Sequence, residues 1–153
     1  MAIKVLKSRL LERALEEQQY FVAADAAHMV ALVATDRNDV VGWTRRGLDL
    51  AERHDGASYW LGPLLNNLGW EYYGAGELEP ALDAFERALA ARERDPANGD
   101  GLALARYGVG KTLRAVGRAD DAIPLLEHAV EWASTESGPD GWFHEELAEA
   151  YAT

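Results

Sequence analysis

The sequence repeats itself with a period of about 41 residues, and this period constrains the fold more than any other feature. Residues 62–94 align with residues 103–135, so that Gly69 falls beneath Gly110 (110 − 69 = 41). The other identical pairs are Gly76 with Gly117, Ala81 with Ala122, Glu86 with Glu127, and Ala88 with Ala129. Small residues that recur at fixed positions are typical of helices that approach each other closely. A period of this length predicts stacked units, each of which buries its apolar face against its neighbours.

Each unit has the pattern of a helix pair. Ala, Leu, Glu and Arg dominate, and apolar residues recur three and four positions apart without alternating, strand-like runs. Glycine-rich and polar breaks separate the helical segments, with Ser58 as the expected N-cap of one helix and Pro63 in its first turn. The expected helices are 3–34 with a candidate interruption near 17–20, then 39–53, 58–73, 78–94, 101–116, 119–134 and 141–152. The sequence therefore predicts an all-α fold.

The central unit carries a recognisable signature. It reads Leu65-x2-Leu68-Gly69-x2-Tyr72, and Ala81-x3-Phe85 and Ala88-Leu89 follow. With Leu in place of Trp, this resembles the tetratricopeptide repeat (TPR), whose signature is W-x2-L-G-x2-Y and then A-x3-F. The period here is longer than the 34 residues of that repeat. In this respect the sequence is similar to the lengthened repeats of kinesin light chains and of many bacterial TPR proteins.

The resemblance implies a right-handed superhelical TPR-like solenoid of about three helix–turn–helix repeats plus a terminal helix, forming a single domain over residues 1–153. The implied units are an N-terminal helix or helix extension (1–20), repeat 1 (21–54), repeat 2 (57–95), repeat 3 (99–135) and a capping helix (141–152). The sequence leaves open whether the chain is a whole protein or part of a longer repeat array.

Composition limits the classes of partner. The net charge of −11 and the pI of about 4.7 argue against nucleic-acid binding, which needs a basic surface, and against docking on anionic membranes. No apolar run is long enough to span a bilayer, and the first residues lack the apolar core of a signal peptide. There is no cysteine for a disulfide or a thiolate metal site. We therefore expect a cytoplasmic protein.

One stretch looks like a nucleotide-binding loop. Residues Ala105 to Thr112 end in Gly-Lys-Thr, as the motif G-x-x-x-x-G-K-[ST] does, but Ala105 replaces its first glycine. That motif requires a strand before it and a helix N-terminus after it, whereas these residues fall in the middle of an expected helix. Gly110 also takes the packing position that Gly69 holds one unit earlier. Nucleotide binding through Ala105–Thr112 is therefore the unfavoured alternative.

No catalytic or metal-binding constellation stands out. His144-Glu145-Glu146-Leu147-Ala148 begins like the zincin motif H-E-x-x-H, but Ala148 replaces the second histidine. The four histidines are far apart, and none has a histidine partner three or four residues away. We therefore expect no enzyme activity, no cofactor and no metal.

The resemblance also implies a binding site. In TPR proteins the first helix of each repeat lines a concave groove, and asparagine at the position of Asn66 often bonds the backbone of a bound peptide. Asp25 and Met29 precede the central groove positions, and Glu145 and Glu149 follow them. The candidate groove residues are Asn66, Trp70, Tyr73, Tyr107, Lys111, Arg114 and Trp142.

These residues favour a non-catalytic module that binds a peptide or a helix of a partner protein, because amides pair with peptide groups and aromatic rings supply contact area. Three alternatives for the groove remain open: it holds the chain's own N-terminal helix, it holds a dimer partner, or it is empty. A homodimer or oligomeric scaffold assembled through the amphipathic N-terminal helix is the main alternative function.

Overall fold

The computed structural model describes residues 2–94, 99–137 and 141–153, and nearly all of them are helical. The eight α-helices of this part of the chain are α1 (Ala2–Glu16), α2 (Tyr20–Val33), α3 (Arg37–Arg53), α4 (Leu61–Gly74), α5 (Leu78–Glu93), α6 (Gly99–Ala115), α7 (Ala119–Trp132) and α8 (Gly141–Tyr151). A 3-10 helix, η1 (Asp55–Trp60), leads into α4, and a short π-helix, η2 (Ala133–Ser137), follows α7. No strand occurs among the described residues, and the all-α solenoid fold is confirmed.

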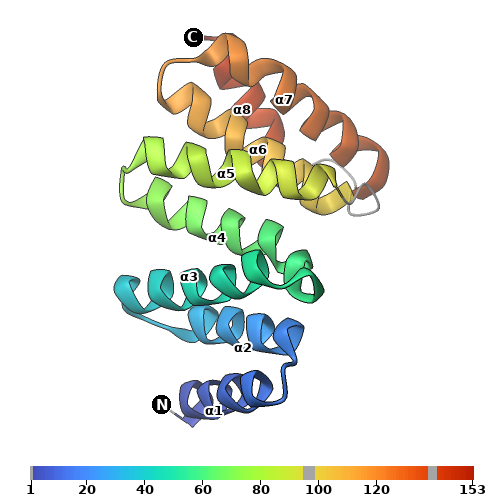
Figure 1. The fold of residues 1–153 in the computed structure, drawn as a ribbon. Coiled ribbons are helices and arrows are strands. Elements are labelled where there is room, and N and C mark those ends of the chain that lie inside the picture. Colours follow the sequence, from blue (N-terminus) through green and yellow to red (C-terminus); the bar gives the residue numbers. More distant parts are fainter. Residues whose placement is uncertain (1, 95–98, 138–140) are drawn as a thin grey trace.

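The helices stack in the order of the sequence, and each packs on the next (Figure 1). Three antiparallel pairs result: α2 with α3, α4 with α5, and α6 with α7. We call α2, α4, α6 and α8 the first helices, and α3, α5 and α7 the second helices. First helices of neighbouring pairs also touch, α4 against α6 and α6 against α8. They form a common surface, named here the first-helix face. Helix α1 lies on α2 at the other end of the stack from α8 (Figure 1).

The turns between paired helices follow from glycine. Gly76 and Gly117, one period apart, have φ of +75° and +80°, a conformation that glycine adopts at low cost. After α4, the Gly76 N–H donates to the Tyr73 carbonyl and the next N–H to the Tyr72 carbonyl, and the same two bonds recur after α6. This arrangement satisfies carbonyls that the helix end would otherwise leave without donors. The period of about 41 residues in the sequence is thus also the spacing of these two turns between paired helices.

One expectation at a helix boundary needs correction, and the candidate interruption between the first two helices is present. Ser58 is not an N-cap of α4, because η1 runs directly into that helix and the Ser58 hydroxyl donates to the Asp55 carbonyl. The candidate interruption near 17–20 is a complete break between α1 and α2. There Gln18 takes the left-handed conformation, with φ of 56°, and the Gln19 N–H donates to the Ala14 carbonyl. A glutamine makes the turn that glycine makes elsewhere in the chain.

The core is centred on Phe85 of α5, whose ring is fully buried. The ring lies against two glycines, Gly69 of its own pair and Gly108 of the next. A Cβ at either glycine would come within 2.6 Å of a ring carbon. In the following pair, Gly110 lies in the same way against Leu126 of α7, at 2.7 Å. Each glycine removes a side chain at the point where a large neighbour must pack.

No helix among the described residues has the length and apolar character that crossing a membrane requires.

The close packing of Phe85 gives a prediction with a built-in control. Gly108→Ala should lower the free energy of unfolding by about 1–3 kcal/mol, because the new methyl group overlaps the Phe85 ring. Gly42→Ala in α3 should raise it by about 0.5–1 kcal/mol, because nothing lies within 4 Å of the added Cβ and alanine is the better helix former. Urea unfolding followed by circular dichroism measures both. Equal effects of the two substitutions would contradict this packing.

Candidate functional site

The seven candidate residues lie on three first helices. Asn66, Trp70 and Tyr73 come from α4, the residues one period later come from α6, and Trp142 comes from α8. Because α4 touches α6 and α6 touches α8, the structure brings most of them into one continuous cluster. The α6 members are Tyr107, Lys111 and Arg114.

Aromatic rings connect the three helices. Trp70 meets Phe85 edge-on with centroids 4.8 Å apart, and its ring also lies 5.8 Å from Tyr73 and 5.9 Å from Tyr107. Tyr107 in turn packs on Phe143 of α8 at 4.8 Å. Only 8% of Tyr107 is exposed, so it supports the site from below, whereas Trp70 and Tyr73 are half-buried and keep some surface.

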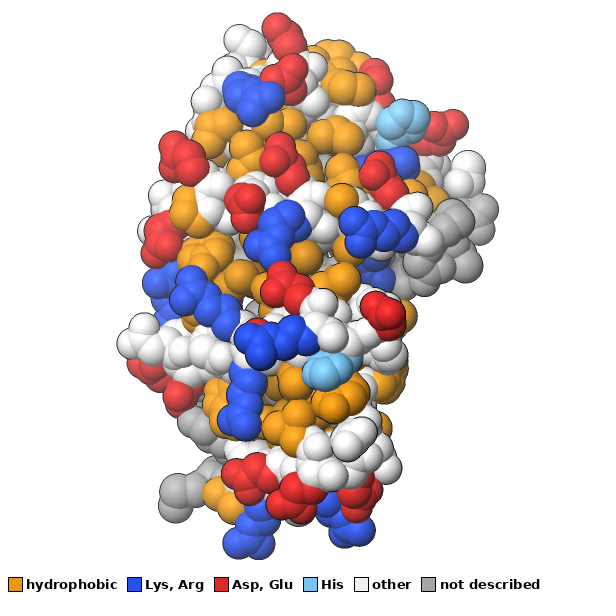
Figure 2. Space-filling view, viewed as in Figure 1, with side chains coloured by type: hydrophobic (Ala, Val, Ile, Leu, Met, Phe, Trp, Pro, Cys, Tyr) orange, Lys and Arg blue, Asp and Glu red, His pale blue; other side chains and the backbone are white. Residues whose placement is uncertain are grey.

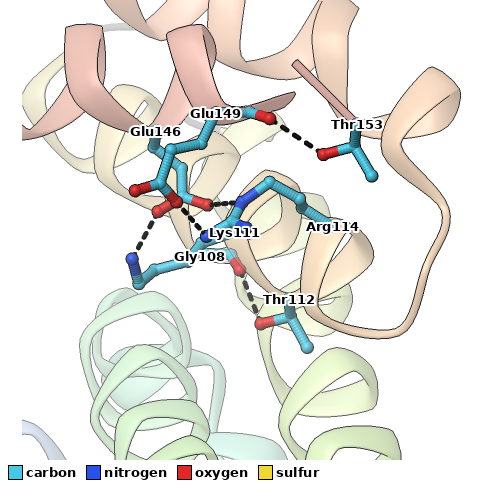
Figure 3. A network of polar contacts seen from close by, with 7 residues as sticks. All are labelled: Gly108, Lys111, Thr112, Arg114, Glu146, Glu149 and Thr153. Atoms are coloured by element: carbon cyan, nitrogen blue, oxygen red, sulfur yellow. Dashed lines mark hydrogen bonds and ion pairs between the residues drawn. The ribbon is translucent and has the colours of Figure 1, made fainter. Parts of the chain in front are cut away.

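Lys111 and Arg114 are engaged within the chain (Figure 3). Both bind the carboxylate of Glu146 on α8, and Arg114 also binds Glu149 through Nη2 at 2.5 Å. The Glu146 side chain is only 3% exposed, and the two cations are about a quarter exposed. A nearly buried carboxylate thus lies between two cations and fastens α8 to α6, because a charge out of water needs such partners.

Burial and charge shift the pKa values of this cluster. Burial by itself would lower the pKa of Lys111, but the hydrogen bond to Glu146 and nearby negative charge together raise it. The hydrogen bond to Glu146 likewise raises the pKa of Arg114. Burial raises the pKa of Tyr107, so its hydroxyl stays neutral at physiological pH. Lys111 also lies over the rings of Tyr107 and Tyr73, at 5.7 and 6.0 Å. Near neutral pH, Lys111 and Arg114 therefore keep their charges and Tyr107 keeps its proton.

A hollow of about 270 Å³ opens between α6 and α8. Its lining combines aromatic rings, one cation and three carboxylates: Tyr107, Lys111, Trp142, Glu145, Glu146 and Glu149. Trp142 at its edge is 73% exposed, the largest exposed fraction among the large apolar side chains that the structure describes. The hollow can therefore receive a side chain that has both apolar and polar parts.

Asn66 lies on α4, apart from this ionic network. Its Oδ1 atom is buried and accepts no hydrogen bond from the described residues. A buried carbonyl oxygen without a hydrogen-bond donor costs free energy. The neighbouring Asn67 is engaged: its Nδ2 lies 3.2 Å from Nδ1 of His28 on α2.

The residues that resemble a nucleotide loop, Ala105–Thr112, lie inside α6. Gly108 and Gly110 receive Phe85 and Leu126. The hydroxyl of Thr112 donates to the Gly108 carbonyl, and Lys111 binds Glu146 (Figure 3). The backbone N–H groups that such a loop would turn toward phosphates are here in the interior of a helix.

Elsewhere on the surface, cations and carboxylates alternate. Figure 2 shows Lys and Arg side chains among Asp and Glu side chains on the face in view. Two ion pairs link neighbouring helix pairs: Arg37 of α3 with Glu77, the residue before α5, at 2.9 Å, and Arg87 of α5 with Glu52 of α3 at 2.6 Å. Within the described ranges, no three His, Cys, Asp or Glu side chains gather as a metal site would require.

Glu146 is the residue that sequence reasoning missed. The groove positions carried over from the family gave Glu145 and Glu149, the first of which is exposed and the second half-exposed. A signal was present, because Glu146 lies three residues after Phe143 and four before Ala150, both buried. A charge on the apolar stripe of a helix needs a partner on the neighbouring helix.

Comparison with known proteins bears on this arrangement. The family model of the tetratricopeptide repeat matches residues 64–94, which cover most of α4 and all of α5. The fold of the whole chain matches that of a Podosopora anserina protein whose repeats are described as nearly identical TPR-like repeats of a kinesin light chain. Two structures of that protein, one of a variant, give TM-scores of 0.53 and 0.52 at 16% sequence identity. The alignments cover 99% and 98% of this chain and 87% of the other. Residues 64–94 thus match the tetratricopeptide repeat, and the chain as a whole has the fold of a TPR-like solenoid.

No curated protein matches the sequence. TPR repeats generally mediate protein–protein interaction on a non-catalytic scaffold. The signature positions themselves differ from pair to pair: Leu68, Tyr72 and Phe85 correspond to Val109, Leu113 and Leu126. The α4 part of the first-helix face presents an amide and aromatic rings, and the α6–α8 part presents paired charges.

The ionic cluster predicts how α8 is held. Glu146→Gln should lower the free energy of unfolding by about 1–3 kcal/mol, because it removes the charge between Lys111 and Arg114 while those cations keep some access to water. Hydrogen exchange should increase first in α8. The matched control is Glu145→Gln, an exposed position on the same helix, which should have little effect. Equal protection of α8 from hydrogen exchange in both variants would show that the ionic cluster does not fasten this helix to α6.

Proposed function

We propose that the chain is a non-catalytic interaction module that binds an extended peptide or a helix of a partner protein along the first-helix face. The ligand would run across α4, α6 and α8 and contact Asn66, Trp70, Tyr73, Lys111 and Trp142, with Tyr107 and Arg114 supporting them. The observation that carries the proposal is the hollow between α6 and α8, which has the 73% exposed Trp142 in its lining.

The chemistry of the face supports a peptide ligand. An asparagine amide pairs with the N–H and C=O groups of a peptide, so it suits a ligand recognised through its backbone. Trp70 and Tyr73 offer partly exposed rings beside it, and Trp142 offers a ring that is mostly exposed. Aromatic side chains of this kind contribute much of the binding energy in protein interfaces, because they bury a large area at little entropic cost.

The charges favour a ligand of mixed sign. Lys111 and Arg114 already bind Glu146, so a ligand carboxylate would have to compete with it for these cations. Glu145 and Glu149 border the same hollow and would attract a basic side chain. A peptide with an apolar side chain for the ring of Trp142 and a Lys or Arg beside it fits this arrangement.

The N-terminal helix does not lie over this face. Helix α1 packs on α2 at the end of the stack, far from α6 and α8 (Figure 1). The α6–α8 hollow therefore remains accessible to a ligand from solution.

Peptides selected from a displayed random library on the immobilised chain provide the test. Trp142→Ala should weaken the selected peptides by about tenfold or more, and Asn66→Ala by about fivefold to tenfold, as expected for loss of an aromatic anchor and of one hydrogen bond. Tyr59→Ala is the matched control, because Tyr59 is a 51% exposed aromatic residue on η1, outside the face. Isothermal titration calorimetry gives the affinities, and circular dichroism confirms folding.

Either of two results would overturn the proposal. One is that no peptide is enriched over the immobilisation matrix. The other is that the enriched peptides bind wild type, Asn66→Ala and Trp142→Ala equally well.

A further inference from the structure

A second hollow lies at one end of the α4–α5 pair, and we call it the arginine hollow. It has a volume of about 260 Å³ and is bounded by η1, the start of α4 and the end of α5. These segments meet at the end of the pair opposite the Gly76 turn (Figure 1). The polar side chains among its described lining residues are those of Ser58, Tyr59, Arg92 and Arg94. No described residue lines both this hollow and the α6–α8 hollow.

The charge of the arginine hollow is opposite to that of the chain. The chain carries a net charge of −11, yet the described residues that line this hollow include no Asp or Glu. Arg92 and Arg94 form no ion pair with a described residue. Arg87, earlier in the same helix, does form one, with Glu52. Two guanidinium groups that lack a carboxylate partner and border one hollow favour an anion inside it.

Arg92 lies directly on the backbone of α4. A Cβ at Gly62 would come within 2.4 Å of Nε and 2.9 Å of Cζ of Arg92, so the guanidinium group occupies the space that the glycine leaves free. Gly62 is buried and Arg92 is partly buried. A guanidinium group that already rests on a helix loses less freedom when it binds a ligand, which favours binding.

This arrangement does not belong to the pattern that stacks the repeats. One period later, none of its three central residues recurs: Gly62 corresponds to Ala103, Arg92 to Ala133 and Arg94 to Thr135. A basic residue in the last turn of a helix can also interact with the negative end of the helix dipole. Helix α7, the counterpart of α5, has no basic residue in its last turn, so the fold does not require one there.

From the two unpaired guanidinium groups and the composition of the lining, the geometry points to a binding site for a phosphate monoester in the arginine hollow. Arg92 and Arg94 bind the phosphate oxygens, because a planar guanidinium group donates two parallel hydrogen bonds to phosphate. A phosphate monoester carries about 1.5 to 2 negative charges at neutral pH, so it matches two guanidinium groups better than a carboxylate does. Leu61 and Ala91 give the hollow apolar walls against which part of the group that carries the phosphate fits.

The acidic character of the whole chain does not prevent this binding. At physiological salt, charges more than about 8 Å apart are largely screened from each other. The two guanidinium groups beside the ligand therefore outweigh carboxylates farther away. The negative end of the α5 dipole is equivalent to only about half a charge, against two full charges from the arginines.

Titration of the ¹⁵N-labelled full chain with phenyl phosphate, followed by nuclear magnetic resonance, tests the inference. The backbone signal of Gly62 and the Nε–Hε signal of Arg92 should shift along one saturable curve. Arg92→Gln should weaken binding about tenfold and Arg94→Gln about fivefold, as expected for loss of a charge-assisted hydrogen bond. The matched control is Arg9→Gln, which removes the same charge from an exposed position on α1 and should leave the affinity unchanged. Circular dichroism confirms that each variant is folded.

Two further probes define the ligand. Benzoate carries a carboxylate on the same ring and should bind about fivefold or more weakly, because it has one negative charge and two oxygens. A short phosphotyrosine peptide distinguishes the source of the phosphate. If it binds more tightly than phenyl phosphate, and still depends on Arg92, the ligand is a phosphorylated segment of a protein. If it does not bind more tightly, the ligand is a small phosphate monoester.

Three outcomes would overturn the inference: no saturable shift with phenyl phosphate, equal affinities of the Arg92→Gln and Arg9→Gln variants, or benzoate binding as tightly as phenyl phosphate. None of them bears on peptide binding at the first-helix face. The Arg92→Gln variant should bind the peptides selected there as wild type does, because Arg92 is not among the groove residues.

Discussion

The ring of Phe85 between two glycines is the contact on which the rest of the structure depends. Gly69 and Gly108 lie on successive first helices, and the ring fills the space that their missing side chains leave. This one side chain therefore fixes how α5 lies on both α4 and α6. Trp70 then meets the same ring edge-on, so the position of the candidate site follows from the packing of the core. Helices α4 and α6 take their places in the common face because Gly69, Gly108 and Gly110 let the second helices come close.

The same contact explains why residues Ala105–Thr112, which resemble a nucleotide loop, form part of a helix that packs against its neighbours. Two of its glycines are needed to receive Phe85 and Leu126, and its lysine is occupied by Glu146. A short motif has its chemical meaning only in the backbone conformation that presents it, and in α6 that conformation is a helix. The residues that differ between the repeats are therefore more informative about function than the residues that recur.

Most of the fold could be predicted from the sequence because the decisive positions are small residues at a fixed period, and they leave a direct trace in the sequence. The turns at Gly76 and Gly117 were readable for the same reason. A break near 17–20 was also expected, but the residue that makes its turn was not, because a glutamine with positive φ is determined by its surroundings and not by its own preference. The capping role expected of Ser58 was wrong, because η1 extends the helical path through it.

The candidate site was predictable only in part, for a physical reason. The register of the repeats indicates which positions of α4 and α6 share a face, but it does not state which of their side chains a neighbouring helix will cover. Tyr107 is buried because Phe143 packs on it, and Lys111 and Arg114 are paired because Glu146 points back at them. Contacts between helices far apart in sequence decide exposure, and exposure decides which residues can meet a ligand.

The most direct test of the account is a nuclear magnetic resonance titration of the five tryptophan indole N–H signals with a peptide selected on this chain. Binding along the first-helix face predicts that the signals of Trp142 and Trp70 shift in step with peptide concentration, while those of Trp43 on α3 and Trp132 on α7 stay in place. Shifts of Trp43 or Trp132 with Trp70 and Trp142 unchanged would place the ligand on the second helices and contradict the account.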